Sequence, residues 1–233
     1  MTTGPLESRV YGSARPPRTV TAMETSQPAA LRTRSSVARP SPVAGLSVAI
    51  VVGLAAGALT AYSQAWLSDT TTSLANSAGP WSVAAFLAAR YNHRVATAVA
   101  ASILTLTCCE VGYAIATEIR GGSNATSTVV FWLVAALLAG PPLGVAGAWS
   151  ARRGLHRGVG FAVLAGVLIG EGLYGWTTVA DTTDWRYWAF ELLAGIVIAL
   201  SAAARSAWPR HAIPAIATAS LTAMVVFTFG RLA

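Results

Sequence analysis

Residues 43–67 read VAGLSVAIVVGLAAGALTAYSQAWL, a stretch that contains no Asp, Glu, Lys or Arg. A hydrocarbon core about 30 Å thick needs roughly 20 helical residues to cross, and this stretch is long enough. The stretch does not show the two-residue alternation of apolar and polar side chains that is typical of membrane β-barrels. It therefore predicts a membrane-spanning helix.

Similar apolar blocks recur along the rest of the chain, separated by short polar segments. Only 11% of the 233 residues are charged and 54% are apolar, whereas a soluble domain carries about a quarter charged residues. We predict an all-α, polytopic transmembrane helical bundle over residues 43–232, with the lipid bilayer as its main partner. Seven spans are expected near residues 43–67, 72–89, 95–118, 129–150, 158–179, 187–205 and 212–230.

Residues 1–42 differ from the rest in composition. They are rich in Pro, Ser and Thr, contain six arginines and have few large apolar side chains. Such a segment cannot bury enough surface to offset the entropy lost on ordering. We expect a disordered cytoplasmic tail whose arginines can contact anionic lipid headgroups. Met1 and Met23 are both compatible with the true start of the protein.

The second span is the weakest, because polar and helix-breaking residues interrupt it. The alternative is six crossings with a broken second segment. The arginines distinguish the two, since short cytoplasmic loops are enriched in basic residues. Seven crossings place thirteen of the 16 arginines inside and three outside, against nine and seven for the alternative. This bias favours seven spans in the plasma membrane, with a cytoplasmic N-terminus and an extracytoplasmic C-terminus.

Apart from Glu118 at the very end of the third span, three carboxyl groups are expected inside the membrane: Glu110 in the third span, Glu171 in the fifth and Glu191 in the sixth. An acidic residue near the centre of a membrane helix costs about 2.5–3.5 kcal/mol, so it normally faces the bundle interior. Apart from Arg205, the last residue of the sixth span, no Lys, Arg or His lies within a predicted span to neutralise these groups. One interpretation is an outward-facing polar site for a proton, a cation or a small polar solute. The other is that the three acids form separate structural hydrogen bonds between helices.

The segment Leu74-Ala75-Asn76-Ser77-Ala78-Gly79-Pro80-Trp81 predicts a helix break beside this site. Pro80 has no N–H to donate to the carbonyl of Asn76, and its ring crowds that carbonyl. Asn76 would then present a free backbone oxygen and an amide side chain, as broken helices of transporters do. A simple kink is the alternative, with Gly79 and Pro80 as its cause.

Pro141 and Pro142 predict a second break, near the middle of the fourth span. The flanking Gly140 and Gly144 would let a neighbouring helix approach closely. We expect a packing kink here rather than a binding site.

Small residues recur at four-residue spacing on the sixth span, where Gly195, Ala199 and Ala203 follow Glu191. Membrane helices use such rows for close contact, so Glu191 should lie on the packed face. A weak internal repeat is also visible, because a shift of 112 residues aligns Tyr62 and Asp69 with Tyr174 and Asp181. This shift superposes spans one to three on spans five to seven and leaves the fourth as a connector.

Three segments carry a resemblance to known sequences: LANSAGPW at 74–81, Phe131-Trp132 with Gly140-Pro141-Pro142-Leu143-Gly144, and Gly170-Glu171-Gly172-Leu173-Tyr174-Gly175. In these segments the chain resembles an uncharacterised family of small multipass membrane proteins of high-GC Gram-positive bacteria. The resemblance implies a multipass membrane architecture over residues 45–230 and no particular activity.

Our leading hypothesis is a transport-like or solute-sensing membrane protein. Its outer-half site would contain Asn76, Glu110, Glu171, Tyr174 and Glu191, with Glu171 as the carboxyl that binds a proton or cation. The alternative is a non-transporting scaffold or assembly protein whose intramembrane polar residues are structural. The sequence contains no phosphate-binding loop, zinc-protease motif or nucleophile elbow. We therefore expect no enzymatic activity, no cofactor, no metal and no nucleic-acid partner.

Overall fold

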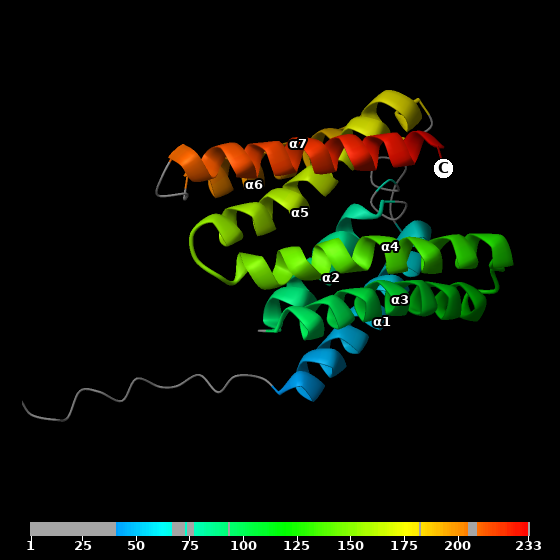
Figure 1. The fold of residues 1–233 in the computed structure, drawn as a ribbon. Coiled ribbons are helices and arrows are strands. Elements are labelled where there is room, and N and C mark those ends of the chain that lie inside the picture. Colours follow the sequence, from blue (N-terminus) through cyan, green and yellow to red (C-terminus); the bar gives the residue numbers. More distant parts are fainter. Residues whose placement is uncertain are drawn as a thin grey trace, which may run out of the picture. The chain divides into compact units, whose positions relative to one another are not determined.

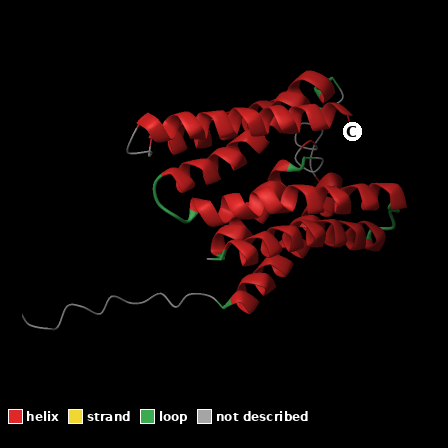
Figure 2. Cartoon of the chain, viewed as in Figure 1, coloured by secondary structure: helices red, strands yellow, loops and turns green. Residues whose placement is uncertain are grey.

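The computed structural model describes residues 41–66, 73, 77–92, 94–181, 183–204 and 209–232, and these residues contain helices and no strands (Figure 1, Figure 2). All of them belong to one compact unit, residues 39–233. The predicted tail, residues 1–42, lies almost entirely outside the described part. The α-helices are α1 (Pro42–Trp66), α2 (Gly79–Tyr91), α3 (Val95–Ile119), α4 (Thr126–Ser150), α5 (Leu155–Tyr174), α6 (Trp185–Ala204) and α7 (Pro209–Leu232), and a π-helical turn, η3 (Gly175–Val179), extends α5.

The all-helical architecture is confirmed, with each helix running opposite to the one before it (Figure 1). Among the described residues, five segments are long and apolar enough to cross a membrane: Pro42–Gln64, Val95–Ile119, Thr126–Ser150, Leu155–Val179 and Trp185–Ala204. They indicate a membrane-embedded, multipass protein. The apolar part of α7, Ile213–Thr228, is shorter. The number of crossings and the orientation of the termini stay predictions.

The second predicted span, 72–89, differs from the structure. α2 begins only at Gly79 and has 13 residues, which at about 1.5 Å per residue cover roughly two thirds of a hydrocarbon core. Pro80 lies in the first turn, where its missing N–H leaves no hydrogen bond unmade. It therefore marks the start of a helix rather than a break within one. Asn76 lies outside the described residues.

α4 continues as one helix through Pro141 and Pro142, so the prolines do not interrupt it, and the packing kink stays a prediction. Prolines are tolerated in membrane helices where neighbouring groups accommodate the freed backbone carbonyls. The close approach expected at the flanking glycines is confirmed. A Cβ atom on Gly140 would lie 2.5 Å from the side chain of Ile103, and one on Gly144 would overlap the backbone of Val99 in α3.

The interior is filled mainly by small side chains, whereas many large apolar side chains point outwards. Side chains that are 0% exposed include Ala49, Ala61, Ala85, Ala89, Ala98, Ala101 and Ala165, and side chains more than half exposed include Leu59, Leu138, Phe190, Leu193 and Leu221. Helices in lipid associate through small residues that let their backbones approach, because lipid tails solvate large apolar groups well. This distribution is that of a bundle surrounded by lipid.

Helix pairs α1–α3 and α5–α7 share one pattern of glycine contacts. In each pair, two glycines of the earlier helix (α1 or α5) lie against backbone carbonyl oxygens of the later helix (α3 or α7). The contacts join Gly53 to Thr105, Gly57 to Cys109, Gly166 to Ala219 and Gly170 to Ala223. The second set lies 113 or 114 residues after the first, close to the offset of 112 seen in the sequence. The contacts support a three-helix repeat with α4 as the connector.

Replacing Gly57 with Leu should separate α1 from α3. A Cβ atom at Gly57 would overlap the carbonyl oxygen of Cys109, which is backbone and cannot move alone. We expect a loss of about 1–3 kcal/mol or more in unfolding free energy, measured by thermal unfolding in detergent. Ala55→Leu is the matched control, because Ala55 is exposed on the same helix. Equal unfolding temperatures for the two variants would contradict the assigned contact.

Candidate functional site

The start of α2 is held inside the bundle. The first N–H groups of a helix have no partner within it and must find one elsewhere. Gly79 donates its N–H to Ser77 Oγ at 3.1 Å, and Ser82 N–H closes the first turn on the carbonyl of Ala78 at 2.8 Å. The N–H of Ala78 is left to bond outside the helix.

Two glutamates from other helices reach this helix start. Glu171 of α5 accepts the N–H of Ala78 through Oε1 at 2.6 Å. Glu191 of α6 accepts the hydroxyl hydrogen of Ser77 through Oε1 at 3.4 Å. A helix N-terminus carries a partial positive charge that stabilises a carboxylate. Residues 77–79 and the two carboxyls therefore form one polar site, which we call the α2 carboxyl site.

Glycines make the close approach in this site sterically feasible. A Cβ atom at Gly79 would overlap Oε1 of Glu191. One at Gly172, directly after Glu171, would lie 2.9 Å from the backbone nitrogen of Leu192, directly after Glu191. α5 and α6 therefore touch backbone to backbone beside the two acids, and this contact brings both carboxyls to the same point. In the row predicted to form the packed face of α6, Glu191 and Gly195 are buried, whereas Ala199 and Ala203 are half-buried.

Each carboxyl of the site keeps one oxygen without a hydrogen-bond partner. The Oε2 atoms of Glu171 and Glu191 are both buried and unpartnered among the described residues, and Glu191 is only 3% exposed. The two carboxyls are direct neighbours. Two adjacent carboxylates without a cation repel each other strongly in a medium of low polarity. A proton held between them would remove this repulsion and use the unpartnered oxygens.

Ser77 and Tyr187 complete the site, and the sequence analysis did not select either. Tyr187 lies on α6 one turn before Glu191, beside Ser77 and both carboxyls. Ser77 could have been found from the sequence, because a serine shortly before a proline is typical of a helix start. The four-residue row on α6, continued back from Glu191, leads to Tyr187.

Residues 37–233 match the model of a family of unknown function, DUF6518. The chain belongs to the DUF6518 family. No curated protein and no solved structure matches the chain. The expectation of an uncharacterised family is met, and the α2 carboxyl site lies within the matched residues.

The other predicted site residues of the DUF6518 chain lie elsewhere. Glu110 is buried in α3 at 2% exposure, and its Oε2 has no hydrogen-bond partner among the described residues. No described contact joins Glu110 to Glu171 or Glu191. The ring of Tyr174 packs over Gly230 of α7. Of the five predicted residues, the structure therefore brings Glu171 and Glu191 together.

The carboxyl oxygens of the α2 carboxyl site are shielded by the protein in this DUF6518 structure. The Oε2 atoms of Glu171 and Glu191 are both buried, and Glu191 is 3% exposed. Within the described part of the chain, no three His, Cys, Asp or Glu side chains form a metal-ligating group. The site as it stands offers two carboxyls, a serine hydroxyl, a tyrosine hydroxyl and backbone N–H groups, which suits a proton better than a bulky solute.

Gly79→Ala should displace the carboxyl of Glu191, because the added methyl group would overlap Oε1. We expect a loss of about 1–3 kcal/mol in unfolding free energy. Glu191→Asp retracts the carboxyl by one methylene group, so in that background Gly79→Ala should cause a smaller loss of unfolding free energy. A double-mutant cycle measured by thermal unfolding gives the coupling between the two positions. If the loss of unfolding free energy in the double variant equals the sum of the losses in the two single variants, the two residues do not touch.

Proposed function

We propose that this DUF6518 protein binds and releases a proton at the Glu171–Glu191 pair, as part of a transport-like or solute-sensing role in the plasma membrane. The observation that carries the proposal is the pair of adjacent carboxyls with unpartnered, buried Oε2 atoms. In hydrocarbon an unpaired charge is expensive, so buried acids of this kind commonly mark proton or ion pathways.

The short helix α2 supports a transport-like role. It has 13 residues, where the neighbouring α3 and α4 have 25 each. Its N-terminus therefore lies within the depth of the bundle rather than at its edge. Discontinuous helices in secondary transporters place their ends at the binding site in this way, near the membrane midplane. α2 fits this pattern because it is short, because it begins inside the bundle at Gly79, and because Glu171 and Glu191 lie at its N-terminus.

The donors around the two carboxyls favour a proton over a metal cation. Ala78 N–H and Ser77 Oγ–H already occupy one oxygen of each carboxyl. The partial positive charge at the helix N-terminus opposes a metal ion at the same place. A proton adds little volume and bridges the two free oxygens. Glu171 and Glu191 therefore titrate as one coupled pair in this proposal.

The proposed orientation follows from the arginine distribution. With the N-terminus in the cytoplasm, the α2 carboxyl site lies in the outer half of the membrane, and proton exchange takes place with the extracytoplasmic side. The C-terminus of α7 is then extracytoplasmic.

The burial of the carboxyl oxygens favours a second candidate, a scaffold protein in which the pair is structural. One oxygen of each carboxyl is satisfied by α2, and this contact alone would fix α2 against α5 and α6. In this alternative the pair stays in one protonation state at all accessible pH values.

Infrared difference spectroscopy on reconstituted protein separates the two candidates. The carboxyl C=O band of a protonated Glu should appear and disappear as the pH is changed, and Glu171→Gln or Glu191→Gln should abolish the change. Glu118→Gln is the matched control, because Glu118 is exposed at the end of α3. A band that persists unchanged across the pH range would contradict proton exchange and favour the scaffold.

Proton flux into liposomes tests the transport step itself. Wild-type protein and Glu118→Gln should dissipate an imposed pH gradient, reported by an entrapped pH-sensitive dye, and Glu171→Gln should not. Equal flux in wild type and Glu171→Gln would exclude this carboxyl from the pathway.

A further inference from the structure

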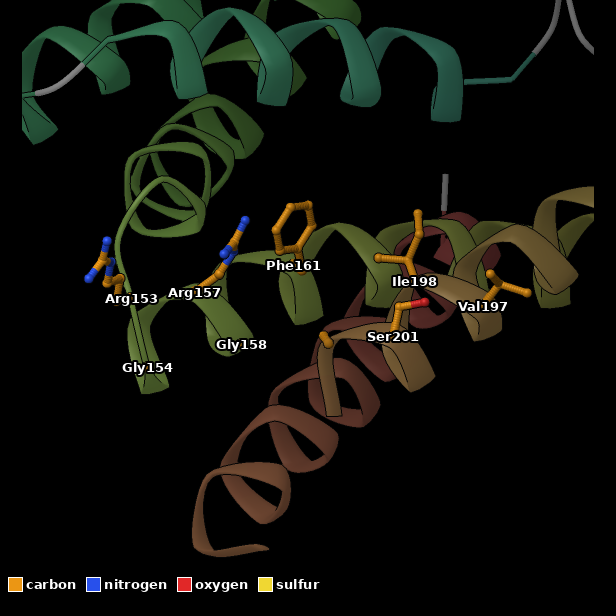
Figure 3. A pocket seen from close by; sticks show the side chains of 9 residues that line it. Arg153, Gly154, Arg157, Gly158, Phe161, Val197, Ile198 and Ser201 are labelled. Carbon is orange, nitrogen blue, oxygen red and sulfur yellow. The ribbon is translucent and has the colours of Figure 1, made fainter. Parts of the chain in front are cut away.

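A groove of about 240 Å³ lies between the first turns of α5 and the last turns of α6. Figure 3 shows Arg153 and Arg157 at one end of the groove, with Val197, Ile198 and Ser201 along the wall that α6 contributes. Phe161 lies between the two groups. The lining contains two arginines and no Asp or Glu.

Among the described residues, no acidic side chain balances the positive charge at this end of the groove. Neither Arg153 nor Arg157 has an acidic partner among the described residues. A third arginine, Arg90 of α2, lies over the ring of Phe161 at 5.4 Å. Burial lowers the pKa of Arg90, and the charge of Arg157 lowers it further. An anion at this position would relieve the repulsion among the arginines.

Along the groove, the charged side chains lie at the end of the bundle and the apolar side chains lie deeper, which matches the charged head and apolar tail of an amphipathic ligand. Arg153 precedes α5 and Arg157 lies in its first turn, at the end of the bundle. Phe161 lies one turn further along α5, about 6 Å deeper. On α6, Ser201 lies near the helix end at Ala204, and Val197 lies one turn deeper. A phosphate bound to the arginines would have apolar side chains directly beneath it.

We propose that this groove binds an anionic phospholipid, with the lipid phosphate on Arg153 and Arg157 and an acyl chain along Phe161, Val197 and Ile198. The planar guanidinium of arginine matches phosphate oxygens in paired hydrogen bonds. Basic pockets between membrane helices at headgroup depth are typical sites for such lipids. The site is separate from the α2 carboxyl site and does not depend on the function proposed there.

Lipid retention measures this binding directly. The full chain is reconstituted in nanodiscs that contain phosphatidylglycerol and phosphatidylcholine, extracted into detergent, and analysed by native mass spectrometry for bound lipid. The wild type should retain phosphatidylglycerol in preference to phosphatidylcholine. The double variant Arg153→Gln/Arg157→Gln should lose about thirtyfold in affinity for phosphatidylglycerol, from two arginine contacts. Equal retention in wild type and variant would overturn the proposal.

Three controls make the result specific. Arg152→Gln removes a neighbouring exposed arginine that does not line the groove, and it should leave retention unchanged. Arg153→Lys/Arg157→Lys keeps the charge and replaces the glutamine variant if that variant does not fold. It should bind phosphatidylglycerol more weakly than the wild type does. Unchanged binding would exclude paired hydrogen bonds from the guanidinium groups to the phosphate. Excess inorganic phosphate should not displace the lipid. Displacement by phosphate alone would show that the groove recognises a free anion and not a lipid.

Discussion

The start of α2 is governed by the lack of water in a hydrocarbon core, where every backbone N–H needs a partner within the protein. A helix that begins inside the bundle, as α2 does at Gly79, leaves N–H groups pointing at its neighbours. Here the partners are the hydroxyl of Ser77 and the carboxyl of Glu171. The same contact gives the carboxyl a hydrogen bond and a favourable dipole. Helix start and buried acid thus stabilise each other, and removing either would leave the other uncompensated.

Small residues bring the participants of this interaction together. α5 meets α6 at Gly172 and meets α7 at Gly166 and Gly170, and α1 meets α3 through glycines at matching positions. The apparent repeat has a further consequence at the site. Gly79 and Glu191 are 112 residues apart, which is the sequence offset of the repeat, and a Cβ atom at Gly79 would overlap Oε1 of Glu191. A small residue in the first repeat makes room for an acid in the second.

Much of the fold could be predicted from the sequence, because length and apolarity determine where a membrane helix forms. The ranges expected for α1, α3, α4 and α6 differ from the observed ones by at most three residues. The prolines were harder to interpret, since their effect depends on their place in the helix. Pro80 starts α2, whereas Pro141 and Pro142 lie within an uninterrupted α4. At the site, the packed face of α6 identified Glu191, but nothing in the one-dimensional pattern indicates which acids meet. Glu110 is as deeply buried as Glu191, yet no contact among the described residues joins it to Glu171 or Glu191.

Cross-linking in native membranes tests the central contact most directly, since Ser77 and Glu191 are 3.4 Å apart at their side-chain oxygens. In a chain whose Cys108 and Cys109 are replaced by alanine, Ser77→Cys and Glu191→Cys should be joined efficiently by a short bifunctional thiol reagent. Ser77→Cys with Glu118→Cys should not be joined, because Glu118 is exposed at the end of α3. Efficient linkage of the first pair alone is the predicted result. Failure of that pair to link, or equal linkage of both pairs, would contradict the placement of the α2 start against α6.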